Sequence, residues 1–181
     1  MYDSSQFVLF SAFCLAAVFC DFCFRRIFNW LILLGLAAQC VWLGVASPMS
    51  SVFAGTWPEA GLGLLLALVF LLPFYAFKAM GAGDVKFFAV VGFWLGAAPL
   101  LSVWLIGSLL AGVHGLVHFC HRNGVVGPWV ALRLVPAQGL VSESPLLQRA
   151  VAWMAAVRGG RSGIPYAAYL AIAAWVVVQW R

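Results

Sequence analysis

Two aspartates at the edges of apolar runs are the residues of this chain best suited to acid–base chemistry. Asp21 ends the first apolar run, and Asp84 begins the fourth. An ionisable residue at such a boundary indicates a function, because removing a carboxylate from water is costly. If the two carboxyls meet, their repulsion leaves one proton shared between them. The ionised carboxylate would take a proton from water while the neutral one donates to a peptide carbonyl, as in an aspartic protease.

Glycines beside the second aspartate fit this chemistry. Gly81 and Gly83 precede Asp84, and Lys86 follows it. Glycine permits tight backbone geometry and the close approach of another chain. A protein that cuts a peptide at a membrane edge needs such a gap, so the pattern favours a protease.

Each aspartate alone also has a structural interpretation. Asp84 could cap the helix that it begins, and Asp21 could pair with Arg25, four residues further along a helix. Together, at one membrane face and with the glycines nearby, the two acids favour a functional pair over two separate structural roles.

The elements that must position these residues are membrane helices. Of the 181 residues, 65% are hydrophobic and 8% are charged, whereas an average soluble domain is about 25% charged. This composition excludes a soluble domain and a disordered chain, and predicts an all-α polytopic membrane protein. Continuous runs rich in Leu, Ala and Phe predict helices rather than barrel strands. The six runs are Phe7–Cys20, Trp30–Val45, Ala60–Phe77, Val85–Ala98, Leu100–Phe119 and Ile164–Trp180.

Two of these runs are short for a membrane span at about 1.5 Å per residue. The first can extend back to Ser4 or Ser5, and the fourth is expected to be a short helix that Pro99 stops. A serine followed by proline at 144–145 predicts the start of another helix in the long connection after the fifth run. This helix would cover Leu146–Val157 and lie on the membrane surface.

Basic residues predict the orientation of the helices. Of the ten Lys and Arg residues, all except Arg181 lie in or beside the odd-numbered connections between the runs. The positive-inside rule therefore predicts six transmembrane helices, both termini outside and a cytoplasmic loop at about 120–163. Orientation and anionic lipid explain the net charge of +5, so we expect no nucleic acid partner. The basic residues in this set are Arg25, Arg26, Lys78, Lys86, Arg122, Arg133, Arg149, Arg158 and Arg161.

Two groups of residues have spacings typical of metal ligands. Cys20 and Cys23 form a C-x-x-C pair, but a structural zinc site needs four ligands and no second pair exists. His114, His118 and His121 fall on one helix face and could bind zinc, although no carboxylate lies near them in sequence. We favour packing for the cysteines and hydrogen bonding for the histidines, and expect no metal.

Three segments resemble motifs of the prepilin peptidases. The run Gly81–Lys86, with the sequence Gly-Ala-Gly-Asp-Val-Lys, resembles the GxGD motif of that family. The segment Asp21–Asn29 is similar to the first aspartate motif, except that Phe28 stands where the family often has proline or a small residue. The segment Gly163–Ala167 resembles the Pro-Tyr at the start of the family's last span. The resemblance covers the chain apart from the 121–160 loop.

The resemblance implies that residues 1–181 form a single membrane-embedded peptidase domain without a cofactor. It would remove the leader from type IV pilin precursors at the cytoplasmic face of the bacterial inner membrane. Asp21 and Asp84 would be the catalytic pair, and Gly81 and Gly83 would shape the loop that carries Asp84. The basic residues that would contact the prepilin or lipid, unless they only orient the chain, are Arg25, Arg26 and Lys86.

A short form of the family is favoured. About nine residues join the first two runs, and nothing before the first run could hold the region with paired CxxC motifs of bifunctional members. The chain therefore resembles the small peptidases of tight-adherence (Flp) pilus systems, TadV or CpaA, and we expect no methyltransferase activity. Pro165 and Tyr166 would shape packing near the site.

Two other functions are compatible with the pattern. A small membrane transporter or channel could use Asp21 and Asp84 as a cation or proton site, although such sites usually lie near the midplane on broken helices. A related GxGD protease that cuts other membrane helices is a narrower alternative.

Overall fold

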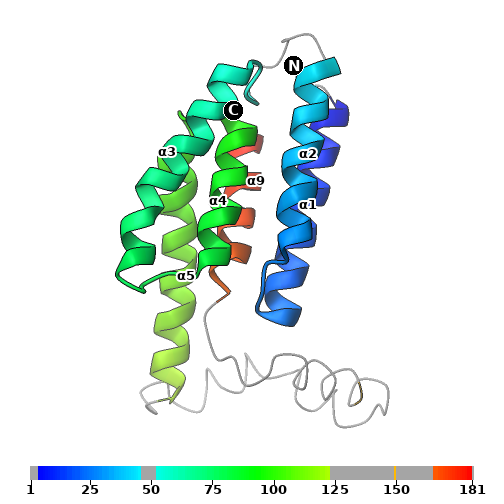
Figure 1. The fold of residues 1–181 in the computed structure, drawn as a ribbon. Coiled ribbons are helices and arrows are strands. Elements are labelled where there is room, and N and C mark those ends of the chain that lie inside the picture. The colour runs from blue at the N-terminus through cyan, green and yellow to red at the C-terminus, as the bar shows by residue number, and fades with distance from the viewer. Residues whose placement is uncertain (1–3, 46–51, 123–148, 150–164, 181) are drawn as a thin grey trace.

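The computed structural model of the chain contains a bundle of helices (Figure 1). The structure describes residues 4–45, 52–122, 149 and 165–180, and these contain six helices and no strand. The expected helical fold is confirmed, whereas the helix expected over 146–157 lies outside the described residues. The helices are α1 (Ser4–Phe24), α2 (Asn29–Val45), α3 (Trp57–Ala76), α4 (Ala82–Leu95), α5 (Leu100–Arg122) and α9 (Tyr166–Gln179).

Helix boundaries follow the apolar runs closely, with one correction at α4. The helix α1 begins at Ser4, as expected. However, α4 ends at Leu95 because Gly96 adopts a φ of 74° and donates its N–H to the carbonyl of Gly92. Glycine takes this left-handed conformation without the clash that a Cβ would cause. Gly96, and not the more distant Pro99, therefore stops α4.

Successive helices run in opposite directions (Figure 1). The start of α1 and the end of α9 lie at one end of the bundle. At the opposite end α1, α3 and α5 finish and α2, α4 and α9 begin; we call this the basal end. Both turns that join α1 to α2 and α3 to α4 therefore lie at the basal end, together with the start of α9.

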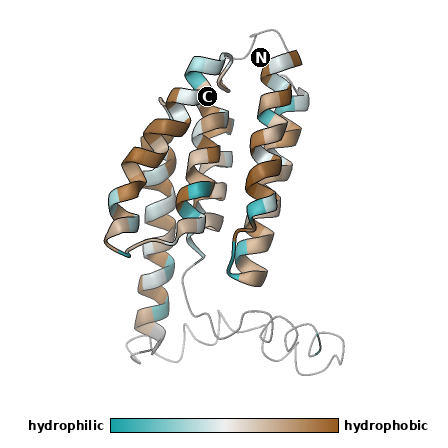
Figure 2. Ribbon diagram, viewed as in Figure 1, coloured by the Kyte–Doolittle hydropathy of each residue, from teal (hydrophilic) through white to brown (hydrophobic). Residues whose placement is uncertain are grey.

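The helix surfaces are apolar. Three helical segments are long and apolar enough to cross a membrane, judged by length and composition, namely Ser5–Phe24, Trp57–Ala76 and Leu100–Cys120. Both α2 and α9 are shorter apolar helices. Figure 2 shows hydrophobic residues over most of the bundle. These features indicate a membrane protein.

The helix α4 forms the centre of the bundle, and almost all of it is buried. It crosses α3 closely at Gly63 and Gly92, where a Cβ on either residue would clash with the backbone of the other. Trp94 donates from Nε1 to the carbonyl of Gly35 at 2.9 Å, which ties α4 to α2. On the other side, α1 and α5 both pack on α9. The helix α4 also contacts α9, so that α9 lies against α1, α4 and α5.

Candidate active site

Asp21 lies in the last turn of α1, where its side chain is 6% exposed. Its Oδ2 accepts a hydrogen bond of 3.0 Å from the backbone N–H of Ala168, in the first turn of α9. The N-cap residue of α9 is Pro165, whose side chain makes no capping hydrogen bond. The first N–H groups of a helix lack partners within it and favour negative charge. Asp21 therefore caps α9 from a different helix.

Asp84 lies in the first turn of α4 and is half-buried. Its Oδ2 accepts from the N–H of Gly81 at 3.3 Å, so the capping interpretation of this residue is confirmed. The carboxyl also interacts with the charge of Asp21 and with the backbone N–H of Ala167, which acts on Asp21 as well. The structure thus brings the two aspartates together at the first turn of α9. Asp84 both caps α4 and pairs with Asp21.

The two glycines before Asp84 provide space rather than an unusual backbone conformation. Neither has a positive φ. A Cβ on Gly81 would lie 3.2 Å from Asp84 Oδ2, which is a tight contact. A Cβ on Gly83 would lie 3.6 Å from Cβ of Ile27, an ordinary contact that joins the α3–α4 turn to the α1–α2 turn. Of the two, Gly81 is the residue whose size bears directly on the carboxyl.

The three basic residues near the site differ in their surroundings. Arg25 follows α1 with a φ of 53°, and its Nε and Nη1 atoms are buried without a hydrogen-bond partner. Arg26 is exposed. Lys86 is exposed and donates from Nζ to Asn29 Oδ1 at 3.3 Å. The three residues therefore do not form one basic surface.

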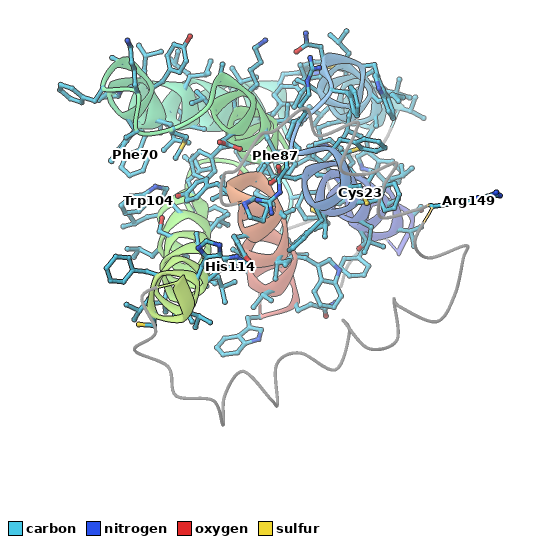
Figure 3. All side chains as sticks on the ribbon, turned by 90° about the horizontal axis from the view of Figure 1, so that it is seen from below. Cys23, Phe70, Phe87, Trp104, His114 and Arg149 are labelled. Carbon is cyan, nitrogen blue, oxygen red and sulfur yellow. The ribbon has the colours of Figure 1, made fainter. Side chains whose placement is uncertain are left out.

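Two tyrosines of α9 join it to α5 through hydrogen bonds, and the one with His114 agrees with the hydrogen bonding favoured for that residue. The hydroxyls of Tyr166 and Ser108 lie 2.7 Å apart. Tyr169 Oη lies 2.7 Å from His114 Nδ1. Viewed from the basal end in Figure 3, α9 lies between α5 and α1, and His114 lies beside α9. Among the described residues no cluster of three metal-ligating side chains occurs.

A cavity of about 490 Å³ opens beside Asp84, between α5, the α3–α4 turn and the start of α9. Its wall on α5 consists of small residues spaced three or four apart, a signal visible in the sequence but not used in predicting the site. The cavity has room for a short extended peptide segment next to the carboxyl of Asp84. Its lining residues are Ala79, Met80, Gly81, Asp84, Ser108, Ala111, Gly112, Gly115 and Tyr166.

The protein is an apolar helical bundle with two carboxyls at one end. Comparison with known proteins gives its class. The sequence matches the type IV leader peptidase family over residues 8–116, which include both aspartates, and the chain belongs to this family. It is 29% identical over 152 residues to a prepilin leader peptidase/N-methyltransferase of Xanthomonas campestris pv. campestris. That alignment covers 80% of this chain and 41% of the relative, so the chain spans about two fifths of the relative's length. No solved structure matches the chain significantly.

Proposed function

We propose that this protein is a prepilin leader peptidase, an aspartic-type endopeptidase that removes the leader of type IV pilin precursors. The observation that supports this proposal most directly is the convergence of Asp21 and Asp84 on the first turn of α9, beside a cavity. Membership of the type IV leader peptidase family supports the substrate class.

In the proposed mechanism the two carboxyls hold one proton between them. The ionised carboxylate takes a proton from a water molecule, whose oxygen attacks the scissile carbonyl carbon. The neutral carboxyl donates its proton to the carbonyl oxygen, giving a tetrahedral intermediate. Transfer of a proton to the leaving nitrogen then breaks the C–N bond and releases the leader. The buried position of Asp21 and the small residues around Asp84 keep the reacting groups close together.

The proposed topology has six transmembrane helices, with both termini outside and the basal end at the cytoplasmic face of the bacterial inner membrane. The alternating helix directions and the basic residues at the basal end support it. In this arrangement residues 1–181 form a single peptidase domain, with a cytoplasmic loop at about 120–163. A prepilin leader would meet Asp21 and Asp84 from the cytoplasm, and exposed Arg26 and Lys86 would contact the precursor or lipid headgroups.

We further propose an Flp-type specificity, similar to the TadV or CpaA peptidases, without methyltransferase activity. Residues 25–28 alone join α1 to α2, which supports the absence of an inserted domain at this point. Cys20 and Cys23 belong to α1 and are not joined by a disulfide. Incubating cleaved pilin with the protein and a methyl donor tests this, and a mass gain of one methyl group would contradict it.

Cleavage of a co-expressed Flp-type pilin precursor tests the proposed activity. Wild type is compared with Asp21→Asn and Asp84→Asn, by gel shift and mass spectrometry. Glu59→Gln is the matched control, because Glu59 is the acid in the first turn of α3, at the end of the bundle away from the site. We expect cleavage by wild type and the control and by neither aspartate variant, with all four proteins inserted and folded.

Cleavage that survives either aspartate substitution would remove that residue from the mechanism. If wild type cleaves no type IV precursor but carries an ion flux that both aspartate substitutions abolish, the peptidase proposal is wrong and the transporter interpretation holds.

A further inference from the structure

The two aspartates differ in the charges around them. The carboxyl of Asp21 interacts with the N–H groups of Ala168 and Ala167 and with the positive charge of Arg25. The carboxyl of Asp84 interacts with the N–H groups of Gly81 and Ala167 and with the charge of Asp21. These interactions include no cation. The pair is therefore asymmetric in its electrostatic surroundings, although it is nearly symmetric in its hydrogen bonds.

Arg25 adopts an unusual conformation beside Asp21. Its φ of 53° is in the left-handed region, which disfavours residues with a Cβ. Its backbone N–H donates to the carbonyl of Asp21 at 3.0 Å, so the residue completes the last turn of α1 while the chain turns toward α2. Strained backbone of this kind in a non-glycine residue is concentrated at functional sites.

The guanidinium of Arg25 is also in unusual surroundings. Its Nε and Nη1 atoms are buried and have no hydrogen-bond partner, although buried donors are nearly always paired. Its charge acts on both Asp21 and Tyr169. Placing part of a cation away from water and from hydrogen-bond partners is costly unless a nearby anion compensates it.

The other titratable groups near Asp21 supply no positive charge. They come from α1 itself, from α4 and from α9, and the guanidinium of Arg25 is the one cation of this set within the described residues. The other members are Cys20, Cys23, Asp84 and Tyr169.

We propose that Arg25 is a positioning residue that keeps Asp21 ionised, so that Asp21 is the general base and Asp84 carries the shared proton. This inference rests on the proposed peptidase function. Asp21 then takes the proton from water, and the hydroxyl of Asp84, which lines the cavity, donates to the scissile carbonyl. Arg25 itself touches neither water nor substrate in this scheme.

Kinetics of precursor cleavage test the role of Arg25. Arg25→Gln removes the charge, Arg25→Lys retains it, and Lys78→Gln is the matched control, because Lys78 is an exposed basic residue that also has a positive φ, 57°. We expect Arg25→Gln to lower kcat about 100-fold, the scale of a general-base contribution, with KM nearly unchanged. Arg25→Lys should keep most of kcat, and Lys78→Gln should change neither constant.

A rise in KM with unchanged kcat in Arg25→Gln would overturn the proposal and make Arg25 a substrate contact. Equal loss in the glutamine and lysine variants would also overturn it, because charge would then be irrelevant. If Arg25→Gln does not fold, Arg25→Asn replaces it, since asparagine tolerates the left-handed conformation. These results are distinct from failure of the peptidase proposal, in which wild type itself does not cleave.

Infrared spectroscopy provides a readout that needs no substrate. In an Asp84→Asn background at neutral pH, the ionised Asp21 should give no carbonyl band of a protonated carboxyl. Adding Arg25→Gln should produce that band, whereas adding Lys78→Gln should not. A double variant of Asp84 and Arg25 that lacks the band would contradict the proposed role.

Discussion

Asp21 joins two helices that are far apart in the sequence. Its carboxylate accepts the N–H of Ala168, 147 positions away, and serves as the cap that Pro165 does not provide. A charge-assisted hydrogen bond of this kind is stronger than one between neutral groups. The residue proposed as the base therefore also contributes to the stability of the bundle.

Substitution of Asp21 should separate these two roles. In Asp21→Asn the side-chain carbonyl can still accept from Ala168, so activity is lost with a small loss of stability. In Asp21→Ala the buried N–H has no partner, which destabilises the fold by about 1–3 kcal/mol. Thermal unfolding of the purified proteins in detergent measures the difference, and equal midpoints for the two variants would contradict the capping role.

The capping role could not be predicted from the sequence, whereas the candidacy of the two aspartates could. An acid at the edge of an apolar run is a local pattern, and so is the Gly81–Asp84 segment. The partner of Asp21 depends on how the last helix packs against the first, which no local pattern encodes. Tyr166 is similar, because its hydrogen bond to Ser108 depends on the packing of α9 against α5.

At the scale of elements, the small residues of α5 determine the room beside Asp84. A Cβ on Gly112 would meet nothing within 4 Å, although this residue lines the cavity. Larger side chains can therefore be added here without a clash in the protein itself. The helix limits were predictable from apolar runs, but the stop of α4 depended on the backbone of Gly96.

Filling the cavity from α5 should block the substrate without unfolding the protein. We expect Gly112→Leu to lower kcat/KM of precursor cleavage at least about tenfold, since the leucine occupies space that a peptide needs. Gly61→Leu is the matched control, because Gly61 is an exposed helical glycine of α3 that also has nothing within 4 Å. Unchanged cleavage by Gly112→Leu would show that the peptide does not use this cavity.

At the scale of the whole molecule, the site is assembled from segments near the start, middle and end of the chain. Asp21, Asp84 and Ala168 come from α1, α4 and α9, and each is fixed by packing along the length of its helix. The close crossing of Gly63 and Gly92 holds α4 against α3. The succession of helices was predictable because hydropathy is distributed over the whole chain, but the arrangement of the helices around α9 was not.

The two helices that begin at the site are short. Both α4 and α9 have 14 residues, or about 21 Å at 1.5 Å per residue, whereas α5 has 23. The hydrocarbon core of a bilayer is about 30 Å thick. Figure 1 shows α4 and α9 beginning above the basal tips of α1 and α5. In a spanning bundle the aspartates are therefore recessed from the membrane surface.

Hydrophobic mismatch follows from this recess. In a spanning bundle, a bilayer that is thin around the outer helices would bring headgroups and water toward Asp21 and Asp84. We expect faster cleavage in vesicles of short-chain lipids than in vesicles of long-chain lipids, at equal protein content and equal precursor insertion. Rates independent of acyl length would argue against a recessed site. If cleavage does depend on acyl length, the bilayer would set the supply of water for the proposed hydrolysis, and lipid composition would regulate it.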